Sequence, residues 1–262
     1  MVLPEFIMSE PLISVIIVNY NGIEFVDGCL KIVLSSRYSS FELIFVDNGS
    51  TYGSREFVKN KFANDPRIRF LDNGASLGPA VGRNRGASLA RGKYLVFLDN
   101  DTRVDPQGLR ELAAVFESDP SVGAAQAKLL RMDTDNLYDC AGDYLGPLGF
   151  LIERSRGTKD KGQFDYIGDI LSAKSAASAI RADLFRGVGG FDEDYYMYLE
   201  ETDLSWRVWL AGLRVVFVPG AIVYHAFNTP RKGFKRYYPK KIVRFYGCRN
   251  YITTLIKNLG LA

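Results

Sequence analysis

The stretch KYLVFLDND, residues 93–101, decides the fold of this chain. Its first six residues form the nearly continuous apolar run that is typical of a strand buried on both faces. Its last three, Asp99, Asn100 and Asp101, set two carboxylates one residue apart just beyond that strand. Hard oxygen ligands of this kind suit Mg²⁺ or Mn²⁺, which complete their coordination with water and substrate phosphates. The same residues could instead cap an ordinary turn.

Apolar runs and helical segments alternate on both sides of this stretch. The other expected strands are LISVIIVN (12–19), FELIFV (41–46), IRFL (68–71) and SVGAAQAKLL (121–130). Helices are expected at about 24–34, 54–62 and 78–91, and from Asp105-Pro106, with Asp105 as the N-cap. This alternation predicts an α/β fold in which helices flank a Rossmann-like, mostly parallel central sheet.

Polar residues follow three of these strands. Ligands of such sheets bind beyond the carboxyl ends of the strands, so these residues should converge on one edge. They are Asn19, Tyr20 and Asn21, then Asp47 and Asn48, then the triplet 99–101. Arg83 and Asn84, near the start of the third helix, could neutralise a phosphate or contact a base. Asp47 could equally form an Asx turn. Arg83 and Asn84 could equally belong to a solvent-exposed helix face.

The spacing of glycines in the third helix gives a separate indication. Gly78, Gly82 and Gly86 recur every four residues, which places them on one helix face and predicts close packing. Neither GxGxxG nor GxxxxGK[ST] occurs, so dinucleotide and P-loop fingerprints are excluded.

The second half of the chain, from about residue 131, is less regular and predicts a smaller mixed region. Glu200, Glu201 and Asp203 cluster at an expected helix start, where the helix dipole favours negative charge. One of them could instead be a general base that accepts a proton from an attacking hydroxyl. His225, the single histidine, ends the expected strand AIVYH and is either structural or a metal ligand beside Asp101.

Charge is distributed unevenly along the chain. No acidic residue follows Asp203, whereas eleven Lys and Arg residues lie between Arg207 and Lys257. The segment 231–249 interleaves basic and aromatic residues, which is typical of peripheral contact with an anionic membrane. A nucleic-acid patch or a solvated helix would have the same composition, but no nucleic acid is expected as a partner. From Pro239 a helix is expected with apolar residues on one face.

Membrane spans and disulfides are not predicted. No apolar run reaches the length of a span, and the first residues lack the basic start of a signal peptide. The three cysteines are far apart and form no CxxC pair. A cytoplasmic location is therefore expected, with peripheral attachment to the inner face of the cell membrane.

Five strings together resemble glycosyltransferase family 2, of GT-A fold. They are ISVIIVNYNG, FELIFVDNGS, GPAVGRNRGASLARGKYLVFLDND, GGFDEDYYMYLEETDLSWR and VPGAIVYH, spanning roughly residues 12–227. LEETDLSWR and the histidine resemble rhamnosyltransferase-like or galactofuranosyltransferase-like members. The resemblance implies a catalytic domain over 1–228, with a nucleotide-sugar half (12–130) and an acceptor half (131–228). A basic, aromatic helical tail over 229–262 would follow.

The resemblance also implies a reaction and a role for each motif residue. The reaction is an inverting transfer from a UDP-, dTDP- or GDP-linked sugar to a hydroxyl of a glycan or polyprenyl-linked acceptor. The Asn19–Asn21 segment, Asp47, Asn48, Arg83, Asn84, Asp99 and Asn100 would bind the donor. Asp101, Asp99 and His225 would hold Mg²⁺ or Mn²⁺. Glu201 occupies the place of the family's catalytic aspartate, with Glu200 as the other candidate base, and Asp203 and Trp206 would shape the acceptor site.

Two other functions fit parts of the sequence. A sugar-phosphate nucleotidyltransferase also uses metal-binding aspartates, but it should carry a basic, Gly-rich loop after the first strand. Asn19-Tyr20-Asn21-Gly22 contains no Lys or Arg. A non-catalytic nucleotide-sugar-binding module would not need the acidic pair at 200–201, so its presence favours an enzyme.

Overall fold

The computed structural model describes residues 10–132, 134–146, 151–226 and 240–259. The strands are β1 (Ile13–Asn19), β2 (Phe41–Asp47), β3 (Ile68–Asp72), β4 (Tyr94–Asp99), β5 (Thr102–Val104), β6 (Val122–Arg131), β7 (Tyr138–Cys140), β8 (Asp143–Leu145), β9 (Leu151–Glu153), β10 (Gly168–Asp169), β11 (Ala177–Arg181) and β12 (Arg214–His225). The helices are α1 (Ile23–Leu34), α2 (Ser54–Lys61), α3 (Gly78–Ser88), α4 (Gly108–Ser118), α5 (Ala182–Gly187), the 3₁₀ turn η1 (Glu193–Tyr195), α6 (Glu200–Leu210) and α7 (Lys240–Asn258).

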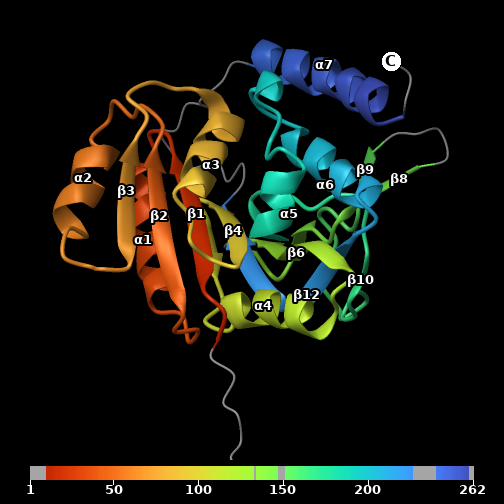
Figure 1. Ribbon diagram of the computed structural model, residues 1–262, viewed down its shortest axis with the longest axis horizontal. Coiled ribbons are helices and arrows are strands. Elements are labelled where there is room, and N and C mark those ends of the chain that lie inside the picture. The colour runs from red at the N-terminus through yellow and green to blue at the C-terminus, as the bar shows by residue number, and fades with distance from the viewer. Residues whose placement is uncertain (1–9, 133, 147–150, 227–239, 260–262) are drawn as a thin grey trace, which may run out of the picture.

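One sheet runs through the molecule and contains ten of the described strands (Figure 1). Its main order is β10-β12-β6-β11-β4-β1-β2-β3. The run β3-β2-β1-β4 is parallel, as the alternation of strands and helices predicts. β11 then lies antiparallel between β4 and β6, and β6 pairs in parallel with β12. The expected donor and acceptor halves therefore share one sheet, and they interleave in it, because β6 of the first half lies between β11 and β12 of the second.

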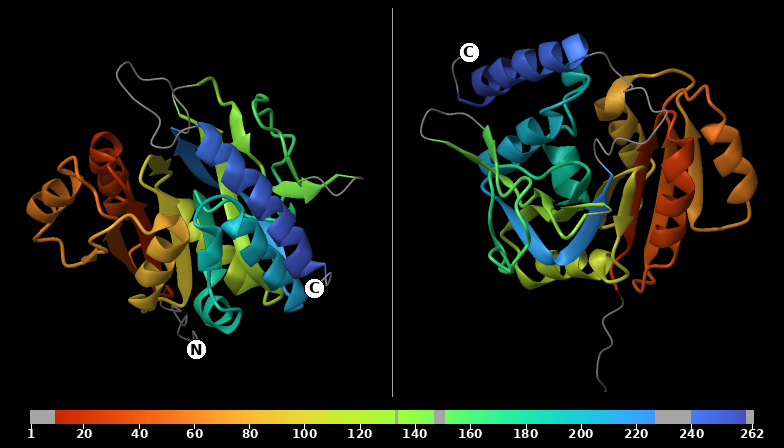
Figure 2. Two further views of the ribbon diagram at one scale, coloured as in Figure 1. Left: turned by 90° about the horizontal axis from the view of Figure 1, so that it is seen from above. Right: turned by 180° about the vertical axis from the view of Figure 1, so that it is seen from behind.

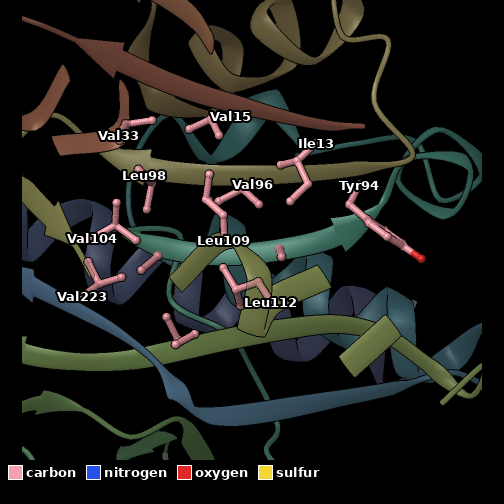
Figure 3. Packing of buried hydrophobic residues seen from close by; sticks show 14 of the residues in the cluster. Ile13, Val15, Val33, Tyr94, Val96, Leu98, Val104, Leu109, Leu112 and Val223 are labelled. Carbon is pink, nitrogen blue, oxygen red and sulfur yellow. The ribbon is translucent and has the colours of Figure 1, made fainter. Parts of the chain in front are cut away.

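The sheet is buried on both faces, which explains the unbroken apolar runs in its strands. Alternate residues of β1 point to opposite sides: Ile13, Val15 and Ile17 belong to one buried cluster and Ile16 to the other. Helices α1, α2 and α4 contribute to the first cluster, part of which Figure 3 shows, and α3, α5 and α6 contribute to the second. Both layers hold the carboxyl ends of β1, β2 and β4 at one edge.

Glycine lets α3 pack closely on the sheet, as the four-residue spacing predicts. A Cβ on Gly82 would lie 2.8 Å from Val18 Cγ1, and one on Gly86 would lie 2.6 Å from Ile16 Cγ2. A larger residue at either position would push the helix off β1. The close approach keeps Arg83, on the same helix, within reach of the residues that end β4.

The helix expected at Asp105-Pro106 begins later, so that prediction is wrong. α4 starts at Gly108, with Gln107 as the N-cap residue. The Asp105 carboxylate accepts a hydrogen bond from the Gln107 amide at 2.9 Å, and the Asp105 carbonyl accepts one from the Gly108 amide. These bonds form a turn because the Asp side chain competes with the helix for backbone amides.

The expected strand AIVYH is the second arm of a longer strand, β12. The pairing of β12 with β6 shifts register between Val218 and Ile222, around Pro219 and Gly220, so the strand bends. Its second arm pairs antiparallel with the short strand β5, which the sequence pattern did not predict. This pairing places His225 opposite Thr102, next to the acidic triplet.

Helix α7 buries its polar side and exposes its apolar side, the reverse of an ordinary amphipathic helix. Its polar residues Asn250, Thr254 and Asn258 are buried. The residues Ile242, Phe245, Ile252, Ile256 and Leu259 lie on the other side and are 39–59% exposed. Pro239 lies outside the described residues. In two views α7 is the outermost element above α6, so its apolar side faces away from the domain (Figures 1 and 2).

Candidate active site

A pocket of about 440 Å³ opens at the carboxyl edge of the sheet. Residues from both halves of the chain line it, among them Arg83, Asp99, Lys174, Glu200, Glu201 and His225. Two of the predicted metal residues, Asp99 and His225, therefore face the same space as the predicted base residues, and Asp101 adjoins this pocket through its contact with His225. Chain segments more than 100 residues apart meet here because β12 and β11 return to the strands of the first half.

Asp99, Asp101 and His225 form a cluster that could hold a metal ion. One ligand atom from each lies within 4.8 Å of the others. The Nε2 atom of His225 is 3.3 Å from Oδ1 of Asp101. The backbone fixes this approach, since the Ala226 amide donates to the Asp101 carbonyl at 3.0 Å. Two carboxylates and one imidazole with open positions suit Mn²⁺ or Mg²⁺.

Asp139 orients the histidine from behind. Its Oδ2 atom is 2.9 Å from Nδ1 of His225, and both side chains are buried. This leaves Nε2 directed at Asp101, which is the carboxylate–histidine arrangement that supports many metal-binding imidazoles. Burial opposes a charge on His225, but the neighbouring Asp101 and Asp139 outweigh it and raise the His225 pKa to about 10. A cation at this site would take the place of that proton.

Arg83 joins the metal cluster to the start of α6. Its guanidinium donates to Glu200 Oε1 at 2.7 Å and to Asp99 Oδ1 at 2.9 Å. The Arg83 side chain is only 6% exposed and Glu200 only 4%, so their ion pair forms away from bulk water, whereas the Asp99 side chain is 36% exposed. Burial opposes the charge on Arg83, but Asp99 and Glu200 hold its pKa above the ordinary value. Arg83 thus fixes the position of Glu200 relative to Asp99.

Glu201 differs from Glu200 in its surroundings. Its nearest cation is Lys174, whose Nζ atom is 3.8 Å from Glu201 Oε1. Burial and the neighbouring charge of Glu200 raise the Glu201 pKa to about 7, although Lys174 opposes the shift. A carboxylate poised near neutral pH is suited to accept a proton. Glu200 is held by Arg83, so protonating it would disrupt an ion pair.

Lys174 is a site residue that the sequence pattern did not indicate. Its Nζ atom lies 3.0 Å from Asp143 and 3.2 Å from Glu153, as well as near Glu201. These carboxylates raise its pKa well above the ordinary value despite its burial. Lys174 therefore stays charged and limits how far the pKa of Glu201 rises. Neither Lys174 nor Asp139 lies in a regular motif, and no local signal identifies them.

The residues predicted to bind the nucleotide sugar, at the ends of β1 and β2, form a buried hydrogen-bond network. Asn19 Nδ2 donates to Asp47 Oδ1 at 3.3 Å, and Asn100 Nδ2 donates to Asn19 Oδ1 at 2.7 Å. Asn100 therefore ties the acidic triplet to β1. Asp47 also accepts a hydrogen bond from the Ser50 amide at 2.9 Å, and this bond forms the turn that its sequence allows. Asn21, with φ of 54°, accepts from the Thr51 amide, and Tyr20 lies between the two asparagines.

Asn48, Asn84, Asp203 and Trp206 do not line the main pocket. Asn48 bonds to the Gly78 carbonyl and to Asn73. Asn84 exchanges bonds with the Phe191 backbone and faces a separate cavity, so the structure gives it a structural role. Asp203 accepts from Arg207 and Asn258, and Trp206 packs in a small cleft beside α7.

A sequence model of glycosyl transferase family 2 matches residues 14–187. The chain is 29% identical over 209 residues to the O-antigen biosynthesis protein RfbC of Myxococcus xanthus, covering 77% of this chain and 16% of RfbC. It is 35% identical over 116 residues to the glycosyltransferase GlyG of Streptococcus pneumoniae, covering 44% of this chain and 38% of GlyG. The chain thus spans well under half the length of these curated relatives.

Solved structures share the fold. GalNAc-T7, solved with UDP, GalNAc and Mn²⁺, superposes with a TM-score of 0.74 over 94% of this chain and 47% of its own, at 17% identity. The mannosyltransferase PcManGT of Pyrobaculum calidifontis, solved with GDP-Man and Mn²⁺, gives 0.69 over 95% of this chain and 64% of its own, also at 17%.

The fold and the site together define the class of protein. The sheet has the GT-A fold, and it carries Asp99, Asp101 and His225 at its carboxyl edge. The chain belongs to glycosyltransferase family 2.

Proposed function

We propose that this glycosyltransferase moves a sugar from a nucleotide-diphosphate donor by a single inverting displacement, with Glu201 as the general base and a divalent cation at Asp99, Asp101 and His225. The observation that carries the proposal is the shared pocket, in which Asp99 and His225 of the carboxylate–histidine cluster face the same space as Glu201. A donor phosphate held at one side and an acceptor hydroxyl at the other would meet there.

The residues at the metal cluster fit a divalent cation. The two carboxylates and the imidazole converge within 4.8 Å, and Asp139 supports the imidazole. The relatives in fold that were solved with Mn²⁺ favour Mn²⁺ over Mg²⁺. When bound, the cation would supply charge stabilisation for the leaving diphosphate.

The chain's own residues account for the proton and for the position of the acceptor. The acceptor oxygen forms a bond to the anomeric carbon while the bond from that carbon to the diphosphate oxygen breaks. The diphosphate leaves with the electron pair, and the acceptor's proton passes to the Glu201 carboxylate. Lys174 keeps Glu201 from becoming too weak an acid, and Arg83 adds positive charge beside Asp99.

The donor and acceptor follow from the two sides of the pocket. We assign the nucleoside of a UDP-, dTDP- or GDP-sugar to the edge formed by Asn19–Asn21, Asp47 and the triplet at 99–101. The acceptor would enter over the second half, near Lys174 and Tyr198. A glycan or polyprenyl-linked glycan is the proposed acceptor, supported by the name of the O-antigen biosynthesis relative. The family membership favours this reaction over nucleotidyl transfer and over a non-catalytic binding module.

The pH dependence of transfer tests the assignment of the base. Only the carboxylate form of Glu201 accepts a proton, and its pKa is raised to about 7. We therefore expect kcat/KM to fall about tenfold for each pH unit below 7 and to level off above it. The measurement is release of nucleoside diphosphate between pH 5.5 and 9 at fixed ionic strength. A rate that stays constant down to pH 5.5 would contradict the assignment.

Peripheral membrane contact is proposed for the tail. Of the segment 231–249, residues 231–239 lie outside the described residues, and the rest begins α7. Exposed apolar residues on the outer side of α7 accompany Lys241, Arg244 and Arg249, and no acidic residue follows Asp203. An apolar face with a basic border suits an anionic lipid surface. Among the described residues, no helix is both long and apolar enough to cross a bilayer.

Vesicle binding tests this contact. The protein is expected to co-sediment with phosphatidylglycerol vesicles, weakly with phosphatidylcholine vesicles, and less at higher salt. Phe245→Ser with Ile252→Ser should reduce binding on the order of tenfold or more, because two exposed apolar side chains are lost. Equal binding by the double variant would contradict the proposal. If the wild type proves to be a dimer, and the double variant is a monomer that binds vesicles as the wild type does, the face belongs to a second copy instead.

A further inference from the structure

The loop that leads into α6 has an unusual backbone. Tyr196, Tyr198 and Leu199 have φ values of 61°, 66° and 67°, a left-handed region that side chains other than glycine rarely adopt. Such a run is held only where surrounding structure over-determines it. The loop places Met197 and Tyr198 on the wall of the active-site pocket. It ends at Glu200 and Glu201, so its conformation sets where the proposed base lies.

Asn250 on α7 contacts this loop at three points. Its Nδ2 atom donates to the carbonyls of Tyr195, Met197 and Tyr198, at 2.9, 2.8 and 2.8 Å. The Asn250 side chain is fully buried. The Asn250 amide thus satisfies the carbonyls on one side of the loop, whereas the Tyr196 carbonyl faces Gly78 on the other side. Without Asn250, the carbonyls of Met197 and Tyr198 would lose this donor, whereas the Tyr195 carbonyl would keep its bonds from the Met197 amide and from Arg249.

Neighbouring contacts support the same loop from both sides. On α7, the Thr254 hydroxyl is 2.9 Å from the Tyr195 hydroxyl, and Asn258 Nδ2 donates to Asp203 at 2.9 Å. On the opposite side, α3 begins at Gly78, where an added Cβ would lie 2.7 Å from the Tyr196 carbonyl oxygen. The loop is therefore enclosed between the start of α3 and the buried polar side of α7.

We propose that Asn250 is a positioning residue, which holds the loop 195–199 in its left-handed conformation and thereby aims Glu201 into the pocket. This inference rests on the proposed function, because it assigns Glu201 as the group being positioned. It also explains why α7 buries its polar side: that side holds the loop 195–199 in place and does not pack on the apolar core.

The test compares Asn250→Ala and Asn250→Asp with the wild type and with Cys248→Ala, an exposed position on the same helix. Asn250→Asp keeps the shape of the side chain but replaces the amide donor with an acceptor. The assays use the UDP-, dTDP- or GDP-sugar that stabilises the wild type in the presence of Mn²⁺. Transfer is followed as nucleoside diphosphate release with an octyl glycoside or short-chain polyprenyl phosphate as acceptor, and donor affinity by calorimetry.

Both Asn250 variants are expected to lose kcat on the order of 10- to 100-fold, because a misplaced base raises the barrier without removing the donor site. Their donor affinity should stay within about twofold of wild type, and Cys248→Ala should match wild type in both measurements. Wild-type kcat in a folded Asn250 variant would overturn the inference while leaving the proposed function intact. Loss of the cooperative thermal transition in both variants would assign Asn250 to domain stability and also overturn it. A wild type that neither binds nor turns over any of these donors would instead refute the proposed function.

Discussion

Glu201→Gln is expected to lower kcat by about 10²- to 10⁴-fold, the usual contribution of a general base. Glutamine keeps the size of the side chain but cannot accept the acceptor's proton. The affinity of the variant for the nucleotide sugar should stay close to that of the wild type, because the donor is assigned to the edge at Asp47 and the triplet 99–101, away from Glu201. Steady-state release of nucleoside diphosphate and calorimetric titration of the donor measure the two effects separately.

Glu200→Gln is the matched control for this prediction. Both residues begin the same helix, and both face the pocket. Glu200 is bonded to Arg83, so its replacement should weaken the link between Arg83 and the start of α6. We expect a loss of about tenfold in kcat, smaller than for Glu201→Gln. The reverse order, with Glu200→Gln nearly inactive and Glu201→Gln active, would transfer the role of base to Glu200.

Asp101→Ala is expected to weaken Mn²⁺-dependent donor binding by on the order of 100-fold or more. The substitution removes the carboxylate nearest to His225 Nε2 and leaves the cluster with two of its three members. Calorimetric titration of the donor, with Mn²⁺ and with a chelator, measures the effect. Asp135→Ala, at a side chain that is 83% exposed, is the control and should bind as wild type does. Equal donor affinity in the two variants would show that Asp101 does not hold the metal.

The parallel half of the fold could be predicted from the sequence because its strands are apolar on both sides. β1, β2 and β4 lie within one residue of the positions that their runs indicate. The polar residues after these strands identify the binding edge, because the carboxyl ends of parallel strands lie at the same edge of the sheet. The helix expected at Asp105 was misplaced, since an Asx turn and a helix N-cap begin with the same residues.

The rest of the site depends on contacts between distant segments. Asp139 supports His225 across 86 positions of the chain, and Arg83 reaches Glu200 across 117. Asp139 is a single polar residue in the short strand β7, and no periodicity marks it. Arg83 and Glu200 were each indicated by the sequence, but nothing in the sequence indicated that they pair. The carboxylates around Lys174 also come from separate elements, the strands β8 and β9 and the helix α6.

Helix α7 illustrates the same limit in another way. Its apolar residues recur at helical spacing, a pattern that ordinarily predicts the buried side. The structure buries Asn250 and Thr254 instead, because the loop before α6 presents backbone carbonyls and a tyrosine hydroxyl to that side. The binary pattern identifies the two sides of a helix. Which side is buried depends on what its neighbour presents.

The central claim is that one pocket binds a nucleotide sugar through a metal held by Asp99, Asp101 and His225. A thermal-shift screen of UDP-, dTDP- and GDP-sugars, each with Mn²⁺, Mg²⁺ or a chelator, tests it most directly. A donor at about 100 times its Kd should raise the midpoint by about 5–10 °C with the metal and by far less with the chelator. We expect this metal-dependent shift in the wild type and its loss in Asp101→Ala. A donor-induced shift of equal size in the chelator, or in Asp101→Ala, would contradict it.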